Sequence, residues 1–173
     1  MTPAEIVLVR HGETEWSRDG RHTGRTDIPL TEAGRAQAGQ LAEPLSEWRF
    51  ARVLSSPLQR ALETCRLAGL GDGVDTTDDL LEWDYGEYEG VTTLQIRETR
   101  PGWYLWRDGC PGGETAAQVG ARVDRVVAAL RPLDADGLQV GVEAAARAVV
   151  RVRDVVAELR PLAADFASFS HDV

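Results

Sequence analysis

Apolar positions along the chain follow patterns that predict particular elements. Residues 6–9, IVLV, are apolar without alternation, which is typical of a strand buried on both faces. A second strand is predicted at about residues 51–54, ARVL. Between them, Thr31 opens a predicted helix with one apolar or small face. The positions that form this face are Ala36, Ala38, Leu41, Ala42 and Leu45.

The segment after the second strand carries helix-start signals. In SSPLQRALET, Ser56 is a predicted N-cap, Pro57 takes the first helical position and Gln59 follows three residues after Ser56, as in a capping box. Arg60 then lies in the first turn, beside backbone N–H groups that have no partner within the helix. A helix N-terminus with an arginine is a favourable site for an anion.

The remaining stretches predict loops and two further helices. Residues 17–30, rich in Gly, Arg, Thr and Asp, predict an ordered loop, and residues 71–79 predict a turn region. A short helix is expected over about residues 93–98, and residues 101–113 are expected to form a loop with two tryptophans. A long helix is predicted from Thr115 through Leu130, ending before Pro132.

The order strand, helix, strand, helix predicts the fold class. It favours an α/β three-layer sandwich, with a mostly parallel sheet and helices on both faces. Ligands of such sheets bind outside the carboxyl ends of the strands. Arg10 and His11 follow one predicted strand, and Arg60 begins the helix after another. We therefore expect these three side chains to line one binding site.

An internal repeat complicates the C-terminal part. A shift of 29 positions aligns residues 122–136 with residues 151–165, identical at 11 of 15 places, and weaker matches extend the repeat to 112–136 and 141–165. We interpret this as duplication of one helix within a single domain over residues 1–173, because a solenoid needs three or more units. Only the second copy continues into a strand-like run, FASFSHDV, which contains His171.

Charge and composition narrow the function classes. The formal net charge of -9 argues against nucleic acid or an anionic membrane surface as a partner. All 19 basic residues are arginine, which excludes chemistry that needs a lysine, such as a Walker phosphate loop or a Schiff base. An anionic substrate must therefore be bound by a local group of arginines, whose planar charge suits phosphate or carboxylate.

Cysteine use and the N-terminal sequence predict the compartment. Cys65 and Cys110 belong to no C-x-x-C pair, so we interpret them as small packed side chains in a reducing compartment rather than zinc ligands or a redox pair. The N-terminal stretch has no secretory signal pattern and no run is long enough to span a membrane. We expect a cytoplasmic protein without a metal or cofactor. The sequence leaves the oligomeric state open, a homodimer included.

The residues themselves permit phosphoryl transfer through histidine. The imidazole of His11 can attack phosphorus, and arginines can neutralise the phosphoryl oxygens. The departing alkoxide then needs a proton from a carboxylic acid, and Glu82 stands between Leu81 and Trp83, which suits that role. The alternative is that Glu82 is a solvated acid in an acidic stretch. Arg25 and Asp27 could likewise form ion pairs within their own loop.

Five separated motifs together resemble one family. LVRHGETEW, GRTDIPLTEAGRAQA, SSPLQRALET, LLEWDYGEYEG and PGGET resemble the phosphoglycerate-mutase-like branch of the histidine phosphatase superfamily, in order, over positions 5 to about 133. The resemblance implies that His11 is the phosphate-accepting nucleophile, that Arg10 and Arg60 bind the phosphoryl group and that Glu82 donates the proton.

The resemblance is incomplete at two positions. The second histidine of the family is matched only in part by His171, because Asp172 replaces the usual glycine. The helix and strand that follow it in relatives are not expected here. Ser17 stands where many relatives have asparagine, and is expected to bind phosphate.

The resemblance implies a phosphomonoesterase of the histidine acid phosphatase type. It would hydrolyse small phosphate esters, sugar phosphates among the candidates, through a phosphohistidine and without cofactor or metal. One alternative is a catalytically impaired relative lacking the complete C-terminal half of the site. Another is a cofactor-dependent phosphoglycerate mutase, which we disfavour because such mutases usually carry longer insertions. Trp103 and Trp106 are expected to pack on the sheet, with a position in the pocket wall as the alternative.

Overall fold

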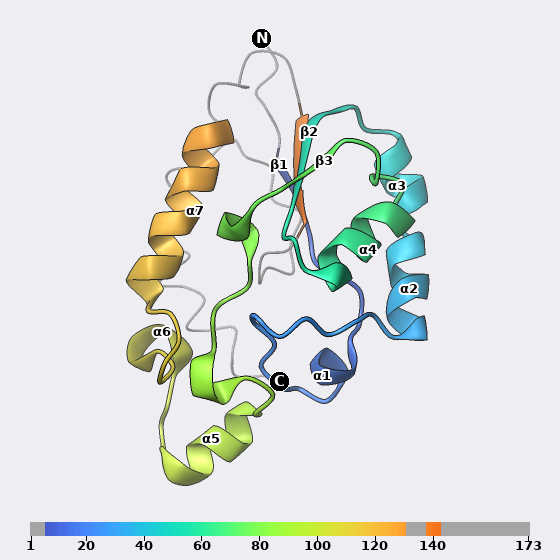
Figure 1. Ribbon diagram of the computed structural model, residues 1–173. Helices are drawn as coiled ribbons and strands as arrows, with labels where there is room; N and C mark the ends of the chain where they lie inside the picture. The colour runs from blue at the N-terminus through green and yellow to red at the C-terminus, as the bar shows by residue number, and fades with distance from the viewer. Residues whose placement is uncertain (1–5, 131–137, 143–173) are drawn as a thin grey trace.

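A parallel sheet forms the centre of the protein. The computed structural model describes residues 6–130 and 138–142, and these contribute four strands: β1 (Ile6–Val9), β2 (Phe50–Ser55), β3 (Val74–Thr76) and β4 (Leu138–Val142). Every pair of neighbouring strands is parallel, in the order β1-β4-β2-β3 (Figure 1). The predicted mostly parallel sheet is confirmed.

Helices lie on both sides of this sheet. On one side are α2 (Glu32–Gly39), α3 (Ala42–Ser46) and α4 (Gln59–Leu67), and on the other is α7 (Ala116–Leu130) (Figure 1). The three-layer α/β architecture is therefore as predicted. Short helices occupy the segments that follow β1 and β3: α1 (Glu15–Arg18), the 3-10 helices η1 (Asp78–Leu80) and η2 (Gly86–Tyr88), α5 (Thr93–Thr99) and α6 (Leu105–Asp108).

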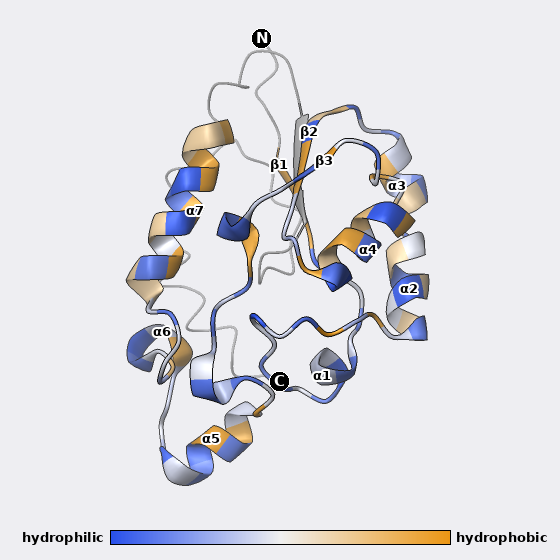
Figure 2. Cartoon of the chain, in the orientation of Figure 1, coloured by the Kyte–Doolittle hydropathy of each residue, from blue (hydrophilic) through white to orange (hydrophobic). Residues whose placement is uncertain are grey.

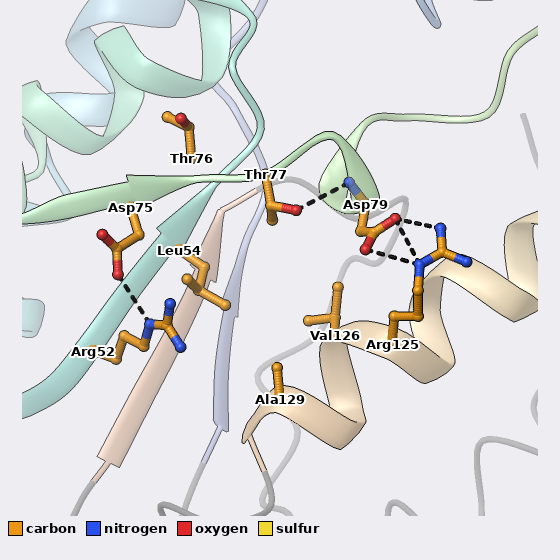
Figure 3. Close-up of a pocket in the computed structure, with 9 residues that line it drawn as sticks. All are labelled: Arg52, Leu54, Asp75, Thr76, Thr77, Asp79, Arg125, Val126 and Ala129. Atoms are coloured by element: carbon orange, nitrogen blue, oxygen red, sulfur yellow. Dashed lines mark hydrogen bonds and ion pairs between the residues drawn. The ribbon is translucent and has the colours of Figure 1, made fainter.

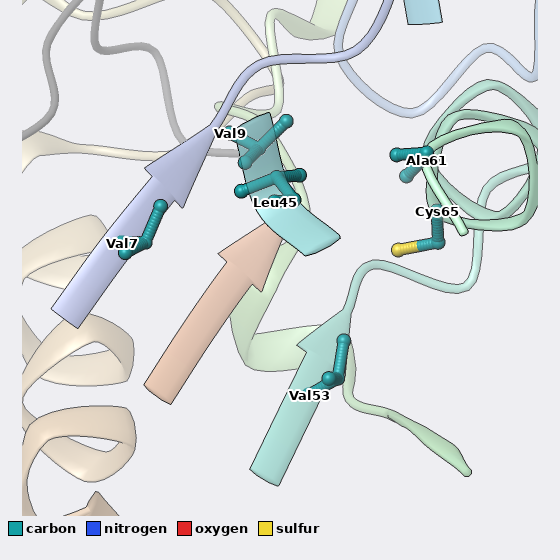
Figure 4. Close-up of a cluster of buried hydrophobic side chains, with 7 residues drawn as sticks. Val7, Val9, Leu45, Val53, Ala61 and Cys65 are labelled. Atoms are coloured by element: carbon teal, nitrogen blue, oxygen red, sulfur yellow. The ribbon is translucent and has the colours of Figure 1, made fainter. Parts of the chain in front are cut away.

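The main core lies between the sheet and α3 and α4. Val7 and Val9 are buried while Ile6 and Leu8 are partly exposed, so successive residues of β1 face opposite layers. Burial of these side chains supplies the main force that holds the helices against the sheet. Most residues of β1 and β2 are hydrophobic (Figure 2), and Figure 4 shows the core residues Val7, Val9, Leu45, Val53, Ala61 and Cys65.

A second apolar cluster forms away from the sheet. Trp103 is buried in this cluster. Trp106 packs against the cluster, with its ring perpendicular to that of Trp83. The expectation that the two tryptophans pack on the sheet is therefore wrong, because the segment after β3 is long enough to build a core of its own. The buried members of this cluster are Trp83, Tyr85, Ile96, Trp103 and Cys110.

The structure corrects three local predictions. The helix expected from Thr31 is interrupted after Gly39 and resumes as α3, because Pro44 lacks an N–H and its ring opposes the carbonyl of Gln40. The turn region at 71–79 contains β3, whose backbone pairs with β2 although only Val74 in it is apolar. The loop at 101–113 contains α6. The helix predicted from Thr115 is confirmed as α7.

The central position of β4 was not predicted. This strand follows the first copy of the repeat and inserts between β1 and β2, where Val142 is the register partner of Val9. The 29-residue offset of the repeat aligns Val142 with His171. His171 and the helix of the second copy lie outside the described residues. Among the described helices, none is long and apolar enough to cross a membrane.

Candidate active site

The predicted phosphate-binding residues lie at one edge of the sheet. Arg10 and His11 directly follow β1, and Arg60 is the second residue of α4, which follows β2. Because the strands are parallel, their carboxyl ends meet at the same edge. The structure therefore brings the segments that carry these three residues to one side of the molecule.

A hydrogen-bonded hydroxyl joins the two segments. The backbone N–H of Gly12 donates to Thr64 Oγ1 at 3.1 Å, and the same hydroxyl donates to the carbonyl oxygen of Arg60 at 2.7 Å. Thr64 is fully buried. The backbone beside His11 is thus tied to the first turn of α4 through a single side chain that water does not reach.

Gly12 owes its identity to close packing of the backbone. A Cβ atom at Gly12 would overlap the carbonyl oxygen of Gly34 in α2, and a Cβ at Gly34 would overlap that of Glu13. The absence of a side chain at Gly12 lets the segment after β1 approach α2. Glycine is the residue that permits such an approach.

One hydrogen bond sets the tautomer of His11. Its Nδ1 lies 2.7 Å from the carbonyl oxygen of Gly12. Because a carbonyl oxygen can only accept, Nδ1 must carry the proton in this bond. In the neutral imidazole the lone pair is then on Nε2.

Arg60 is fully buried and holds a loop in place. Its exposed fraction is 0%, and its guanidinium donates to the carbonyl oxygens of Thr26 at 3.0 Å and Gly24 at 2.9 Å. A buried guanidinium needs such acceptors, since an unsatisfied charge inside a protein is strongly unfavourable. These two bonds fix the plane of the guanidinium relative to residues 24–26.

Glu89 binds the opposite side of the same loop. Its carboxylate accepts hydrogen bonds from the backbone N–H groups of Gly24 at 2.9 Å, Arg25 at 3.0 Å and Thr26 at 3.3 Å. The carboxylate of Glu89 therefore accepts hydrogen bonds from the backbone N–H groups of the loop, and the guanidinium of Arg60 donates hydrogen bonds to its carbonyl oxygens. Sequence reasoning missed Glu89, whose only sequence signal is its place in the acidic stretch EWDYGEYEG.

The start of α4 differs from the prediction. The helix begins at Gln59, and Ser56 is not its N-cap: the Ser56 hydroxyl accepts a hydrogen bond from Leu58 N–H at 3.3 Å. The Gln59 N–H instead donates to the carboxylate of Asp27 at 2.9 Å. The N-terminus of α4 therefore already holds an anionic group of the protein itself.

Arg25 and Asp27 pair outside their own loop, contrary to one interpretation of the sequence. Arg25 forms ion pairs with Asp84 at 3.7 Å and with Glu114 at 3.4 Å. Asp27 contacts Gln59 through both its carboxylate and its carbonyl oxygen. These contacts connect the segment after β1 to the segments after β2 and β3.

Glu82 and Arg10 both act on the environment of Tyr85. Burial raises the pKa of the Tyr85 phenol well above its ordinary value. The negative charge of Glu82 raises this pKa further, whereas the positive charge of Arg10 lowers it. The charges of these two side chains thus act on the same hydroxyl with opposite sign. Glu82 is partly buried, and its Oε1 accepts a hydrogen bond from Trp83 N–H at 2.7 Å.

The hydroxyl of Ser17 takes part in a helix cap. Ser17 Oγ accepts from Thr14 N–H at 2.9 Å and donates to the Thr14 carbonyl at 3.1 Å, while Thr14 Oγ1 accepts from Ser17 N–H. This capping box starts α1. Phosphate binding by Ser17 stays a prediction, and it would require its hydroxyl to leave the Thr14 carbonyl. His171 lies outside the described residues.

A shallow cavity of about 120 Å³ lies elsewhere, between β2, β3 and α7 (Figure 3). Both arginines that line it are paired, Arg52 with Asp75 at 3.0 Å and Arg125 with Asp79. Its cationic groups are thus compensated by neighbouring carboxylates. Within residues 6–130 and 138–142, no cluster of three or more His, Cys, Asp or Glu side chains could hold a metal ion.

Known proteins resemble this arrangement in sequence and in structure. The chain is 50% identical over 125 residues to an acid phosphatase of Mycobacterium tuberculosis, covering 71% of this chain and 61% of that protein. It is 38% identical over 156 residues to sedoheptulose 1,7-bisphosphatase of Saccharomyces cerevisiae, and this match covers 77% of this chain and 57% of that protein. The solved structure of open reading frame Rv3214 of Mycobacterium tuberculosis superposes with a TM-score of 0.76 at 45% identity, over 81% of this chain and 73% of that one.

These matches establish the family but span only part of the relatives. The chain covers about three fifths of the length of the two curated relatives. The family model of the histidine phosphatase superfamily (branch 1) matches residues 6–152, which include His11, Arg60 and Glu82. The chain therefore belongs to branch 1 of the histidine phosphatase superfamily.

Proposed function

We propose that this protein is a phosphomonoesterase that hydrolyses small phosphate esters through a phosphohistidine on His11. The observation that carries the proposal is the hydrogen-bonded connection from Gly12 through Thr64 to Arg60, which ties the backbone beside His11 to the backbone of a residue whose guanidinium is buried. A nucleophile and an anion-binding residue whose backbones are joined in this way suit phosphoryl transfer, in which positioning and charge neutralisation supply most of the rate.

The reaction would proceed in two displacements. Nε2 of His11 attacks phosphorus while Arg10 and Arg60 neutralise the phosphoryl oxygens. As the N–P bond forms, the P–O bond to the alcohol breaks, and the Glu82 carboxyl gives its proton to the departing oxygen. Water then attacks phosphorus and yields its proton to the Glu82 carboxylate, while the N–P bond breaks and its electron pair returns to Nε2 of His11. Inorganic phosphate leaves, and both side chains return to their starting states.

The substrate class is a small ester rather than a phosphorylated macromolecule. The net charge of -9 disfavours polyanionic partners, so attraction must come from the arginines at the site. The relative from yeast is named as a sugar bisphosphatase, which supports sugar phosphates as the first compounds to test. No metal or cofactor enters the proposed steps, because arginine and histidine supply the positive charge.

Turnover of p-nitrophenyl phosphate by wild type and His11→Ala tests the proposal. We expect wild type to release phosphate and to form an acid-labile radiolabelled phosphoenzyme, and His11→Ala to do neither. The matched control is His22→Phe, which keeps a ring stacked on Tyr85 and should retain turnover. Turnover that is indifferent to His11→Ala would overturn the proposal.

Two further measurements separate the alternatives. A mutase would transfer phosphate to monophosphoglycerate after priming by bisphosphoglycerate, instead of releasing inorganic phosphate. An impaired relative would be folded but release no phosphate from any ester. We also propose His171 as the second histidine of the site, and expect His171→Ala to lower turnover while leaving the unfolding transition in place.

A further inference from the structure

A buried ion pair holds the segment that carries Glu82. The guanidinium of Arg122, in α7, meets the carboxylate of Glu114 with two hydrogen bonds, Nε to Oε1 at 2.8 Å and Nη2 to Oε2 at 3.0 Å. The side chains are 8% and 15% exposed. Such bidentate pairs fix both distance and orientation, which single-point contacts do not.

The remaining terminal nitrogen of Arg122, Nη1, donates hydrogen bonds to the segment that precedes Glu82. Its Nη1 donates to the carbonyl oxygens of Asp79 at 3.0 Å and Leu81 at 2.5 Å. Leu81 is the residue directly before Glu82. The position of the preceding peptide group is therefore set by a side chain of α7, a helix more than thirty residues further along the chain.

Glu114 holds the C-terminal side of the same segment. Its Oε2 accepts from the N–H of Asp84 at 2.9 Å, and its own N–H donates to the Asp84 carbonyl at 2.9 Å. Its carbonyl oxygen accepts the indole N–H of Trp83 at 3.0 Å. Peptide groups on both sides of Glu82 are thus attached to one ion pair.

The negative charge of Glu114 maintains its ion pair with Arg122. Burial alone would raise the pKa of its carboxyl, but hydrogen bonds from Arg122 and from Asp84 N–H outweigh burial and hold the pKa below its ordinary value. The carboxylate therefore stays ionised through the neutral range, and the pair with Arg122 persists with it.

We infer that Arg122 and Glu114 are positioning residues that aim the Glu82 carboxyl at the leaving-group oxygen. The inference rests on the proposed function, in which Glu82 supplies the proton when the P–O bond breaks. Neither residue touches the substrate. Their effect should appear only where protonation of the leaving group limits the rate.

The leaving group separates this role from general stabilisation of the fold. Phenyl phosphate leaves as a basic phenoxide and needs the acid, whereas 2,4-dinitrophenyl phosphate leaves as a stable anion and hardly does. Misplacing a general acid that supplies a large rate factor should lower kcat/KM for phenyl phosphate about tenfold in Arg122→Lys and Glu114→Gln. For 2,4-dinitrophenyl phosphate we expect a change of less than about threefold, by the same reasoning.

The controls use neighbouring residues of similar chemistry. Arg125 lies on α7, as Arg122 does, and forms an ion pair with Asp79 that Arg125→Lys alters. Its side chain is 62% exposed, and it holds no peptide group next to Glu82. Arg125→Lys should leave kcat/KM unchanged for both substrates. Glu82→Gln should reproduce the selective loss. The quotient kcat/KM is used because it reports phosphorylation of the enzyme, before hydrolysis of the phosphohistidine.

Each outcome has one meaning. Equal losses on both substrates, or no loss on either, in Arg122→Lys and Glu114→Gln would overturn the inference while leaving the proposed function intact. Turnover that survives His11→Ala would overturn the proposed function instead. If Arg122→Lys does not fold, as judged by circular dichroism, Glu114→Gln decides the question when Arg25→Gln is measured beside it, because Arg25 also pairs with Glu114.

Discussion

The guanidinium of Arg60 donates a hydrogen bond to the carbonyl oxygen of Gly24 at 2.9 Å, inside the protein. The N–H of the same Gly24 donates to Glu89 at 2.9 Å. One peptide segment thus connects a positive and a negative side chain that lie 29 residues apart in the sequence. The orientation of Arg60 consequently depends on residues that sequence reasoning did not select.

Replacing Glu89 by glutamine should loosen this segment. The variant removes the charge and turns one oxygen acceptor into an N–H donor facing backbone N–H groups, so we expect about 1–3 kcal/mol lower stability to urea unfolding. The turnover of p-nitrophenyl phosphate should fall as well, because the carbonyl partners of Arg60 shift. Glu87→Gln, an exposed neighbour in η2, is the control and should change neither quantity.

Gly12→Ala should destabilise the protein strongly, because the added Cβ overlaps the Gly34 carbonyl oxygen and backbone must move to relieve it. We expect a loss of about 1–3 kcal/mol or more, as for other overpacked sites. Gly39→Ala is the matched control, for which we expect a change in stability of the opposite sign. It lies at the end of α2 with open space around it and should stabilise by about 0.5–1 kcal/mol. Thermal unfolding of both variants measures the difference.

The hydroxyl of Thr64 can be removed with little change in shape. Thr64→Val leaves the buried Gly12 N–H without its acceptor, so unfolding free energy should fall by about 1–3 kcal/mol. Turnover should fall too, because the link to Arg60 is lost, and Thr64→Ser should restore much of both. Thr99→Val removes an exposed hydroxyl that bonds the Ile96 carbonyl, and a comparable loss there would contradict the argument.

His22 predicts a loss of stability in weak acid. Burial lowers its pKa from 6.5, against the smaller opposing effect of Glu89. The unfolded chain therefore binds a proton at a higher pH than the folded protein does. Stability is retained above about pH 6.5 and declines as pH falls from there through the lowered folded pKa.

Urea unfolding at pH values on either side of 6.5 checks this prediction. His22→Phe keeps a ring against Tyr85 but cannot titrate, so its stability should change less over this range than that of wild type. Thr93→Val removes the hydrogen bond to His22 Nε2 without removing the titrating group. It should retain a decline towards acid, and a flat profile for it would count against His22 as the cause.

Several features of the fold follow directly from local sequence. Residues 6–9 form a strand because β-branched residues favour extended backbone and Val7 and Val9 are buried in the core. The helix predicted from Thr115 forms α7, because its apolar residues recur at helical spacing. The order of strands and helices then limits the architecture to a parallel sheet with helices on both faces. Because the strands are parallel, Arg10 and Arg60 come to the same edge.

Contacts distant in sequence could not be predicted in the same way. β3 and β4 are strands because backbone groups of neighbouring strands pair with them, although their own side chains give a weak signal. The capping of α4 by Asp27 and the attachment of residues 24–26 to Glu89 depend on where other chain segments pass. The sequence by itself determined which residues could carry the chemistry and in which elements they stand. Tertiary structure alone decided what orients them, because a buried hydrogen bond requires both partners to be brought together by the whole fold.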